Sequence, residues 1–335
     1  MTKRLIITNG DSAAGHLKGA HRGALIVSLV RPLIWGRLFT EAELAVFFGR
    51  KAKTKGKAKT KPHWLDYKLL WRDDTKIETP DNGLVEICTW ADTIELWIDP
   101  RPNDQVQLIC LLHFLRQHPE IAAKLSFVQS YTPMGGHLAE VHAQWKLPVV
   151  KLSDDHFELA SRAWRALGAA TPEDWFGLLA TDLSLLPRLR NAVIQLLKEL
   201  PWRATGLGAT EMRMLDFISG NETPAGVLQF ETNDSGRIFD YWEIGALLDG
   251  LGRCRTPAIS GLKDGPFTME LHDDPERFRR YRTDKISLTP LGNRILAHTD
   301  DFARHNTVRR WWGGTKLTNK HLWRWDQDNH VLVAP

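Results

Sequence analysis

Cysteine is scarce in this 335-residue chain, and long apolar runs are missing. Cys88, Cys110 and Cys254 are odd in number, far apart and free of a CxxC pair, which excludes a disulfide framework and a zinc knuckle. No segment approaches the roughly 18 apolar residues of a membrane helix, and the N-terminal apolar run is too short for a signal peptide. We therefore expect a cytoplasmic protein with no membrane partner.

Net charge gives little support for a broad nucleic-acid surface. The formal charge is +4, from 44 basic and 40 acidic residues. The tract GRKAKTKGKAKTKP at 49–62 holds seven of the basic residues, and without them the balance is about −3. Because this tract has low complexity and no apolar face, we expect a disordered insertion. Alternatively, it tracks a phosphate backbone through Lys53, Lys55, Lys57 and Lys59.

Apolar strand-like segments alternate with helical ones in residues 1–145, which predicts an α/β domain with a mostly parallel sheet. Buried strands are expected at 5–7, 24–30, 93–98 and 125–129. A small-residue helix should follow the first strand, and an amphipathic helix at 104–116 should begin with Asp104 as its N-cap.

The rest of the chain is helical at first and then mixed. Residues 146–204 predict a helical bridge, residues 205–300 a winged-helix-like α+β domain, and residues 301–335 a tryptophan-rich hairpin. The winged-helix pattern consists of a helix at 210–219 opened by a threonine cap, a helix at 240–251, a β-hairpin from 267–271 and 286–288, and a helix start at Thr289-Pro290.

Tryptophans gather near the C-terminus of the chain, at Trp311, Trp312, Trp323 and Trp325. We expect them to close the core between domains, with Gly313-Gly314 allowing a close backbone approach. The alternative is an aromatic shelf for a ligand base.

Six segments together resemble a bacterial family, the domain of unknown function number eighteen thirty-five. They are ITNGDSAAG at 7–15, LWIDPRPNDQVQL at 96–108, LPRLRNAVIQLLKELP at 186–201, TGLGATEMRML at 205–215, LTPLGNRIL at 288–296 and RRWWGGTKL at 309–317. The resemblance spans almost the whole chain and implies little about activity. Where such proteins tend to carry an Asp, a His and a Glu after the second strand, this sequence has Arg31, Ile34 and Trp35. If those groups serve catalysis in relatives, this chain has lost it or uses a cationic site.

The Gly10-Asp11-Ser12 turn is the most chemically informative segment. In open α/β sheets, ligands bind at the carboxyl ends of the strands, where the next helix presents free N–H groups. Because Asp11 would repel a bare phosphate, a nucleoside or a metal-bridged group suits this edge better. The ligand-binding candidates are Asn9, Gly10, Asp11, Ser12, Trp97, Asp99, Asp104 and Gln105.

Two other interpretations of this edge remain open. A side-chain oxygen of Asp11 or Ser12 can simply cap the helix. Asp11, Asp99 and Asp104 can together hold a divalent cation, but Asp104 is already explained as a cap, so we predict no metal site.

The same turn resembles the nucleophile block of GDSL-type esterases, which makes Asp11 and Ser12 catalytic candidates in a hydrolase or transferase. A nucleophilic serine needs a base and an oxyanion hole. Such enzymes take the base from a D-x-x-H motif, and the nearest string here, Asp301 to His305, is one residue too long. His137 and His142 are expected to be surface groups.

Charges argue against DNA reading by the winged-helix-like region. Its candidate recognition helix at 238–252 contains Asp240, Glu243 and Asp249 and no Lys or Arg, so it would repel a phosphate wall. We therefore favour a protein-interaction module. The arginine cluster at 277–282 is expected to form a basic wing, with Arg279 and Arg280 as nucleic-acid candidates.

The sequence thus predicts an α/β N-terminal domain with a mostly parallel sheet, a helical bridge and a winged-helix-like α+β C-terminal domain. The expected function is binding of a small-molecule ligand of nucleotide or sugar-phosphate type, coupled to an interaction module with a regulatory role. The alternatives are an enzyme using Asp11 and Ser12, and a nucleic-acid binder using the lysine tract and the arginine cluster. The patterns assign no cofactor, substrate or oligomeric state.

Overall fold

The computed structural model describes residues 3–22, 25–29, 33–49, 68–71, 83–234 and 236–335. The lysine tract beyond residue 49 and Arg31 lie outside the described residues. The chain forms two compact units. The first contains Met1–Leu33, Phe39–Arg165 and Leu183–Leu189, and the second contains Ile34–Leu38, Ala166–Asp182 and Arg190–Pro335.

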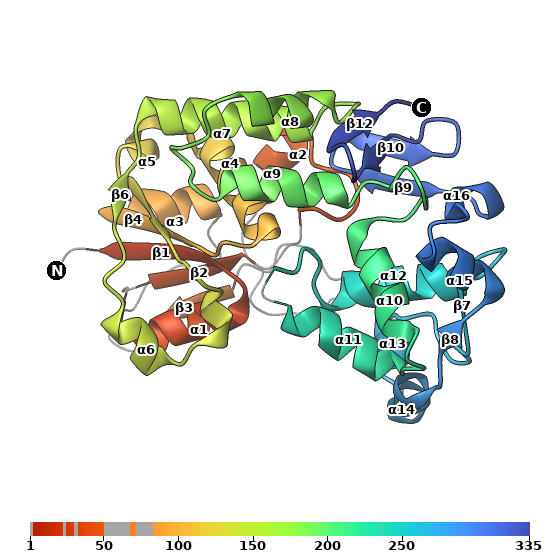
Figure 1. The fold of residues 1–335 in the computed structure, drawn as a ribbon. Coiled ribbons are helices and arrows are strands. Elements are labelled where there is room, and N and C mark those ends of the chain that lie inside the picture. The colour runs from red at the N-terminus through yellow and green to blue at the C-terminus, as the bar shows by residue number, and fades with distance from the viewer. Residues whose placement is uncertain (1–2, 23–24, 30–32, 50–67, 72–82, 235) are drawn as a thin grey trace. The chain divides into compact units, whose positions relative to one another are not determined.

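The first unit is built on a six-stranded sheet in the order β3-β2-β1-β4-β5-β6 (Figure 1). Strands β2, β1, β4 and β5 are parallel, and the edge strands β3 and β6 are antiparallel to their neighbours. The bounds are β1 (Arg4–Asn9), β2 (Leu25–Leu29), β3 (Lys68–Trp71), β4 (Thr93–Ile98), β5 (Leu125–Gln129) and β6 (Val150–Lys151). The α/β class and the four predicted strands are confirmed.

The sheet continues past residue 145, where we expected the domain to end, because β6 pairs with β5. The bridge expected at 146–204 is correspondingly divided between the two units. Most of α7 (Asp154–Leu167) belongs to the first unit, and almost all of α9 (Leu189–Lys198) belongs to the second.

Helices cover both faces of the sheet. Helices α1 (Asp11–Gly19) and α6 (Ala139–Gln144) lie on one face, and α3 (Leu84–Trp90) and α4 (Pro102–Leu115) lie on the other (Figure 1). The core on the α1 side includes Ile6, Ala13, Ala14, Leu17, Ile26 and Trp97. The first unit also contains α2 (Glu41–Gly49), α5 (Pro119–Ala122) and the 3-10 turn η1 (Met134–Gly136).

Helix α4 begins earlier than its sequence pattern predicted. Its N-cap is Arg101 and Pro102 starts the helix, so the prediction that Asp104 is the N-cap is wrong. Proline favours this earlier start because its φ is already helical and it lacks the N–H that a first turn leaves unpaired. Asp104 instead occupies the first turn, and every residue of α4 is buried.

The second unit combines short helices with three small antiparallel sheets among its described residues. Its helical segments are α8 (Glu173–Gly177), η2 (Leu178–Ala180), α9, α10 (Ala209–Ile218), α11 (Pro224–Asn233), α12 (Tyr241–Gly252), α13 (Met269–His272), α14 (Pro275–Thr283), α15 (Pro290–Leu296) and α16 (Phe302–His305). Its strands are β7 (Ile259–Ser260), β8 (Ser287–Leu288), β9 (Arg309–Trp312), β10 (Thr315–Thr318), β11 (Arg324–Asp326) and β12 (Val331–Val333). In the described part of the chain, no helix is long and apolar enough to cross a membrane.

The region expected to form a winged helix differs from the prediction in three places. The strand predicted at 267–271 is wrong, because Thr268 caps helix α13 by accepting from the Leu271 N–H, and β8 pairs with β7 instead. The arginine cluster lies on helix α14 rather than on a wing. The N-cap of α10 is Gly208 and not Thr210. The helix start at Thr289-Pro290 is confirmed, since the Thr289 hydroxyl accepts from Gly292 N at 3.1 Å.

Residues 301–335 were predicted to form one tryptophan-rich hairpin, but they contain α16 and two antiparallel strand pairs, β9 with β10 and β11 with β12. Trp312 donates its indole N–H to the Leu196 carbonyl at 2.8 Å, and Trp325 packs edge-on against Phe176, so both rings serve the core of the second unit. Gly314 lies directly against the Gly168 carbonyl, where any Cβ would collide. The close backbone approach predicted for the Gly313-Gly314 pair is therefore present.

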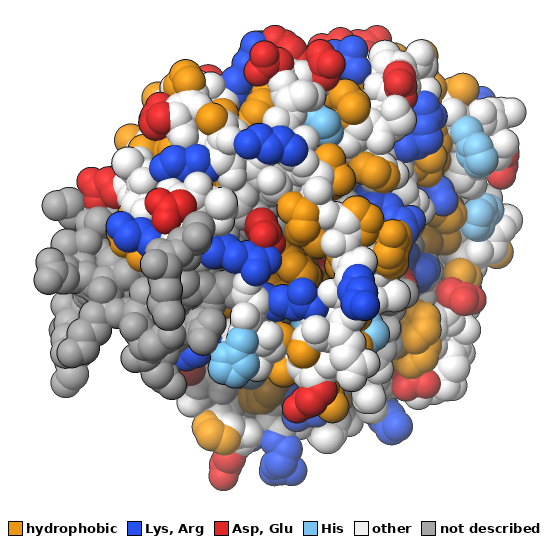
Figure 2. Space-filling model, turned by 90° about the vertical axis from the view of Figure 1, so that its left-hand side faces the viewer, with side chains coloured by type: hydrophobic (Ala, Val, Ile, Leu, Met, Phe, Trp, Pro, Cys, Tyr) orange, Lys and Arg blue, Asp and Glu red, His pale blue; other side chains and the backbone are white. Residues whose placement is uncertain are grey.

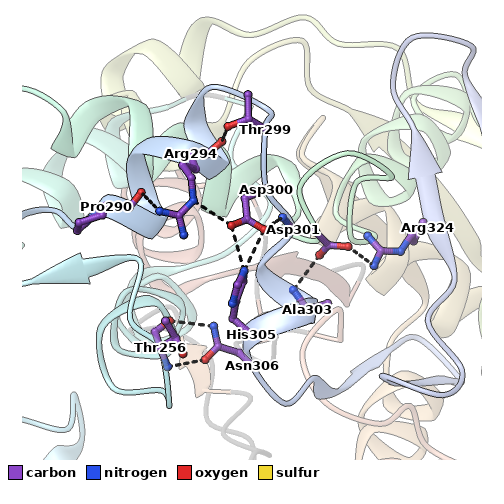
Figure 3. A network of polar contacts seen from close by, with 10 residues as sticks. All are labelled: Thr256, Pro290, Arg294, Thr299, Asp300, Asp301, Ala303, His305, Asn306 and Arg324. Carbon is purple, nitrogen blue, oxygen red and sulfur yellow. Dashed lines mark hydrogen bonds and ion pairs between the residues drawn. The ribbon is translucent and has the colours of Figure 1, made fainter.

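A polar network ties α15, α16 and β11 together (Figure 3). Asp300 accepts from His305 at 2.9 Å and from Arg294 at 3.0 Å. These contacts lower the pKa of Asp300 to about 2, with the His305 hydrogen bond as the main cause. The carboxylate of Asp300 thus stays ionised and holds the two elements that it joins.

The neighbouring Asp301 makes a second set of contacts in this network (Figure 3). One carboxylate oxygen accepts from Ala303 N at 2.8 Å and so caps α16, and the other accepts from Arg324 at 2.6 Å. Asp301 is buried, so its loss removes a helix cap and leaves a mostly buried guanidinium without that partner.

We predict that Asp301→Ala lowers the free energy of unfolding by about 2–4 kcal/mol, through loss of the cap and of a charged hydrogen bond. Asp301→Asn is the matched control, because an amide oxygen can still cap α16, and it should cost roughly half as much. Urea denaturation at neutral pH measures both. Equal losses for the two variants would mean that the cap contributes nothing.

Candidate functional site

The winding of the first unit reverses between β1 and β4. From β1 the chain passes through α1 to β2 on one side, while β4 lies on the other side of β1 and leads through α4 to β5. Helices α1 and α4 lie on opposite faces of the sheet (Figure 1). Open α/β sheets bind ligands at such a switch point, outside the carboxyl ends of the two strands. We call this place, between Asn9 and Asp99, the switch point.

Asn9 ends β1 and is the most unusual residue at the switch point. It is 7% exposed, and neither its amide nitrogen nor its amide oxygen has a hydrogen-bond partner among the described residues. Ile6 lies in the core on the α1 side, so alternation along the strand directs Asn9 to the α4 side. Its backbone partner on β2 is Leu29. Asn9 was predicted as a ligand-binding candidate, and the structure points to its side-chain amide as the group that would bind.

Gly10 is the N-cap of α1, with φ of 74°, so the interpretation of Asp11 or Ser12 as the N-cap is wrong. The positive φ suits glycine, and no described atom lies within 4 Å of where a Cβ would stand. Asp11 is exposed in the first helical turn and accepts from the Ser28 hydroxyl at 3.3 Å.

Asp99 follows β4 and is 3% exposed. One carboxylate oxygen accepts from the Ser130 hydroxyl at 3.1 Å and from Met134 N at 2.9 Å. These bonds fix the chain as it leaves β5 and enters η1. Asp99 therefore organises the edge of the sheet, which is a different role from the ligand contact that the sequence predicted.

Gln105 and Arg101 bring further polar atoms to this edge. Gln105 donates to the Asp99 carbonyl at 2.7 Å and to Gln129 Oε1 at 3.1 Å. In the part of the chain that the structure describes, its own Oε1 and the buried Nε of Arg101 have no partner. Arg101 was missed from the sequence, although its position directly after β4 was the available signal.

Trp97 was predicted to contact the ligand, but it is 2% exposed and belongs to the core on the α1 side. Its indole N–H donates to Glu95 at 2.8 Å, and the Arg22 guanidinium lies 5.7 Å from its ring centroid. The prediction for Trp97 finds no support, because its position places the ring against α1 and not beyond the strand end.

The metal hypothesis for Asp11, Asp99 and Asp104 finds no support among the described residues. Within the described ranges, no three His, Cys, Asp or Glu side chains are grouped so that they could hold an ion. Asp99 is committed to Ser130 and Met134.

The esterase interpretation finds no base at Ser12. Within the described ranges, no histidine or carboxylate is hydrogen bonded to the exposed Ser12 hydroxyl. Asp301 and His305 belong to the second unit, where Asp301 caps α16 and His305 bonds Asp300. Ser12 instead lies against the backbone of η1, 3.3 Å from where a Cβ on Gly135 would stand.

The nucleic-acid candidates on α14 are partly neutralised. Arg280 pairs with Asp264 at 2.9 Å, and Arg277 approaches the same carboxylate at 3.9 Å, whereas Arg279 is exposed. On the face shown in Figure 2, which is the left-hand side of Figure 1, where the first unit is drawn, Lys and Arg side chains lie among acidic and apolar ones instead of forming one basic field. Lys53, Lys55, Lys57 and Lys59 lie outside the described residues.

The acidic residues of α12 have internal partners. Glu243 accepts from Asp240 N at 3.2 Å, and burial raises its pKa to about 7. Asp249 accepts from Arg253 at 3.1 Å and also from Phe267 N. Glu243 and Asp249 therefore serve the packing of the second unit.

His142 of α6 forms a cluster with His16 and His137. This cluster was not predicted from the sequence, because His142 was expected on the surface. His142 is fully buried, with its ring centroid 5.5 Å from that of His16 and 4.5 Å from that of Trp145. The pKa of His142 is lowered to about 4, mainly by burial and also by the neighbouring His16, His137 and Arg22, against a smaller opposite effect of the Met134 backbone.

This shift predicts acid sensitivity. The unfolded chain takes up a proton at His142 near its ordinary pKa of about 6.5, while the folded protein resists until about 4, so folding stability is lost as pH falls through that interval. In His142→Phe, the loss over this interval should be smaller by up to about 1.4 kcal/mol per pH unit.

Urea denaturation at several pH values between 7 and 4 measures that slope. The comparison at pH 7, where His142 is neutral in the folded state and mostly neutral in the unfolded state, largely isolates the effect of packing. Parallel stability curves for the two proteins would show that His142 does not resist protonation.

Comparison with protein-family models found no match to this chain, and a search among curated proteins found no relative. The resemblance to the family of domains of unknown function therefore stays a prediction.

Proposed function

We propose that the first unit binds a small polar ligand at the switch point. The observation that supports this best is the Asn9 amide, which is buried with neither polar atom bonded to a described residue. An unpaired buried group of this kind costs about 1–3 kcal/mol. A ligand that pairs with Asn9 recovers this free energy when it binds, which favours the bound state.

The second unit is proposed to respond to the ligand as a protein-interaction module. It contains three helices, α10 to α12, and then the short paired strands β7 and β8 and helix α15. This order resembles a winged helix. The backbone passes between the two units five times along the chain, at residues 33–34, 38–39, 165–166, 182–183 and 189–190. Such repeated connections give ligand binding in one unit several covalent routes to the other.

We predict that Asn9→Leu keeps or raises the melting temperature of the ligand-free protein and abolishes the ligand-induced shift. Replacing an unpaired buried amide by an apolar group of similar size removes a polar group that gains nothing in the free state. Differential scanning fluorimetry with nucleosides, nucleotides and sugar phosphates measures both effects.

Thr8→Val is the matched control, one residue earlier on the same strand. The Thr8 hydroxyl is buried but donates to the Trp97 carbonyl at 2.9 Å, so its loss should cost about 1 kcal/mol and leave the ligand shift intact. A panel without any shift, or a shift that survives in Asn9→Leu, contradicts the proposed site.

A further inference from the structure

The unpaired atoms at the switch point define the chemistry of what would fill it. We infer that the ligand carries a hydrogen-bond donor and an acceptor side by side on one flat edge, as a nucleobase does, and that Asn9 reads this edge. This inference rests on the proposed ligand site and specifies its ligand class. A carboxamide group presents the same pair of atoms, so it is the second source of this chemistry.

The Asn9 side chain supplies both halves of such a pair. Its nitrogen donates and its oxygen accepts, and both atoms are buried and unpartnered among the described residues. An asparagine amide can therefore make two parallel bonds to a base edge, as it does with adenine in nucleic acids. A ligand with a donor alone or an acceptor alone would leave one atom of Asn9 unpaired.

Gln105 adds a third unpaired atom, and its hydrogen bonds show whether that atom donates or accepts. Gln129 donates through Nε2 to the carbonyls of Ile98 and Ser130, at 3.0 and 3.1 Å, so its Oε1 must accept. Gln105 therefore turns its own Nε2 toward that oxygen and toward the Asp99 carbonyl. The unpaired atom of Gln105 is consequently an acceptor, which calls for another donor on the ligand.

Carboxylates near the switch point disfavour phosphate as the recognised group. Asp11 and Asp104 stand in the first turns of α1 and α4, where their charge offsets the positive end of each helix. Asp99 lies buried at the same edge. Arg101 brings one cation to this edge, and its buried Nε has no partner within the described ranges. Three carboxylates thus lie near a single guanidinium.

The neighbours of Asn9 disfavour a polyhydroxylated sugar as well. Leu29 is its backbone partner on β2 and is buried, and the strand beside it ends in the fully buried Ile98. Each sugar hydroxyl needs a partner when it is desolvated. In the described part of the edge, the unpaired buried atoms are two on Asn9, one on Gln105 and one on Arg101, which suits a base edge between apolar walls.

Isothermal titration calorimetry on the full chain tests the inference. The probes are adenosine, guanosine, cytidine and uridine, with ribose, inorganic phosphate and nicotinamide as comparisons. We expect at least one nucleoside to bind, and its analogue lacking the exocyclic group of the paired edge to bind at least about tenfold more weakly. For adenosine that analogue is purine riboside.

Two variants separate recognition from folding. Asn9→Asp keeps the size of the side chain and removes its donor, and Asn9→Leu removes both polar atoms; circular dichroism checks that each is folded. Both should weaken nucleoside binding at least about tenfold, and Asn9→Leu should erase the difference between adenosine and purine riboside. Thr8→Val should bind as the unmodified protein does.

The outcomes distinguish this inference from the proposed site. Ribose or inorganic phosphate binding as tightly as the nucleosides, with dependence on Asn9, overturns the base edge while the site stands. Nicotinamide binding that depends on Asn9, without nucleoside binding, supports the paired edge and assigns it to a carboxamide. If no probe binds, or if binding ignores Asn9, both proposals fail.

Discussion

The requirement that buried polar groups be hydrogen bonded shapes the carboxyl edge of the sheet more than any other constraint. Asp99, in the loop after β4, meets this requirement by accepting from Ser130 and from the Met134 backbone, which both belong to the loop after β5. Gln105 meets it for the Asp99 carbonyl from the opposite side. The loops after β4 and β5 are thus held in place by one carboxylate and one amide, and a rigid edge of this kind is what a selective site requires.

At this edge, the Asn9 amide departs from that requirement, because both of its polar atoms lack a partner among the described residues. The second unit shows what the chain does with a buried polar group that serves structure: Glu199 is buried, its pKa is raised to about 7 by burial, and it still accepts from the Thr210 hydroxyl at 2.8 Å. Asn9 lies in an equally dry place without such compensation. Among the buried amide side chains of the described residues, it is the one with both polar atoms unpaired. This pair of unpaired atoms is the observation on which the proposed ligand site rests.

The strands of the first unit were predictable from the sequence because each is a short, nearly continuous apolar run, as expected of a strand that is buried on both faces. The runs at β2, β4 and β5 coincide with the observed elements. Helix starts were less predictable. At α4 the N-cap is Arg101, which makes no side-chain cap bond, and at α13 the run from Phe267 turned into a helix because Thr268 caps it. Apolar content alone cannot distinguish a short strand from a short helix.

The sequence predicted that the candidate residues lie at the carboxyl edge of the sheet. It did not predict to which face of the sheet each side chain points. Position after a strand says that a residue is near the edge, whereas alternation along the strand decides which face it serves. Trp97 lies on the α1 side, and Asp11 accepts from Ser28 on that same side. Asn9 points to the α4 side, where Gln105 lies.

This division of faces orders the candidates at the switch point. The unpaired atoms of Asn9 and Gln105 lie with α4, whereas Asp11 and Ser12 belong to the first turn of α1 on the other face. A ligand that satisfies the unpaired atoms therefore approaches the α4 side first and meets α1 only at its edge. For that reason, recognition at Asn9 is a better supported role for this edge than nucleophilic attack by Ser12.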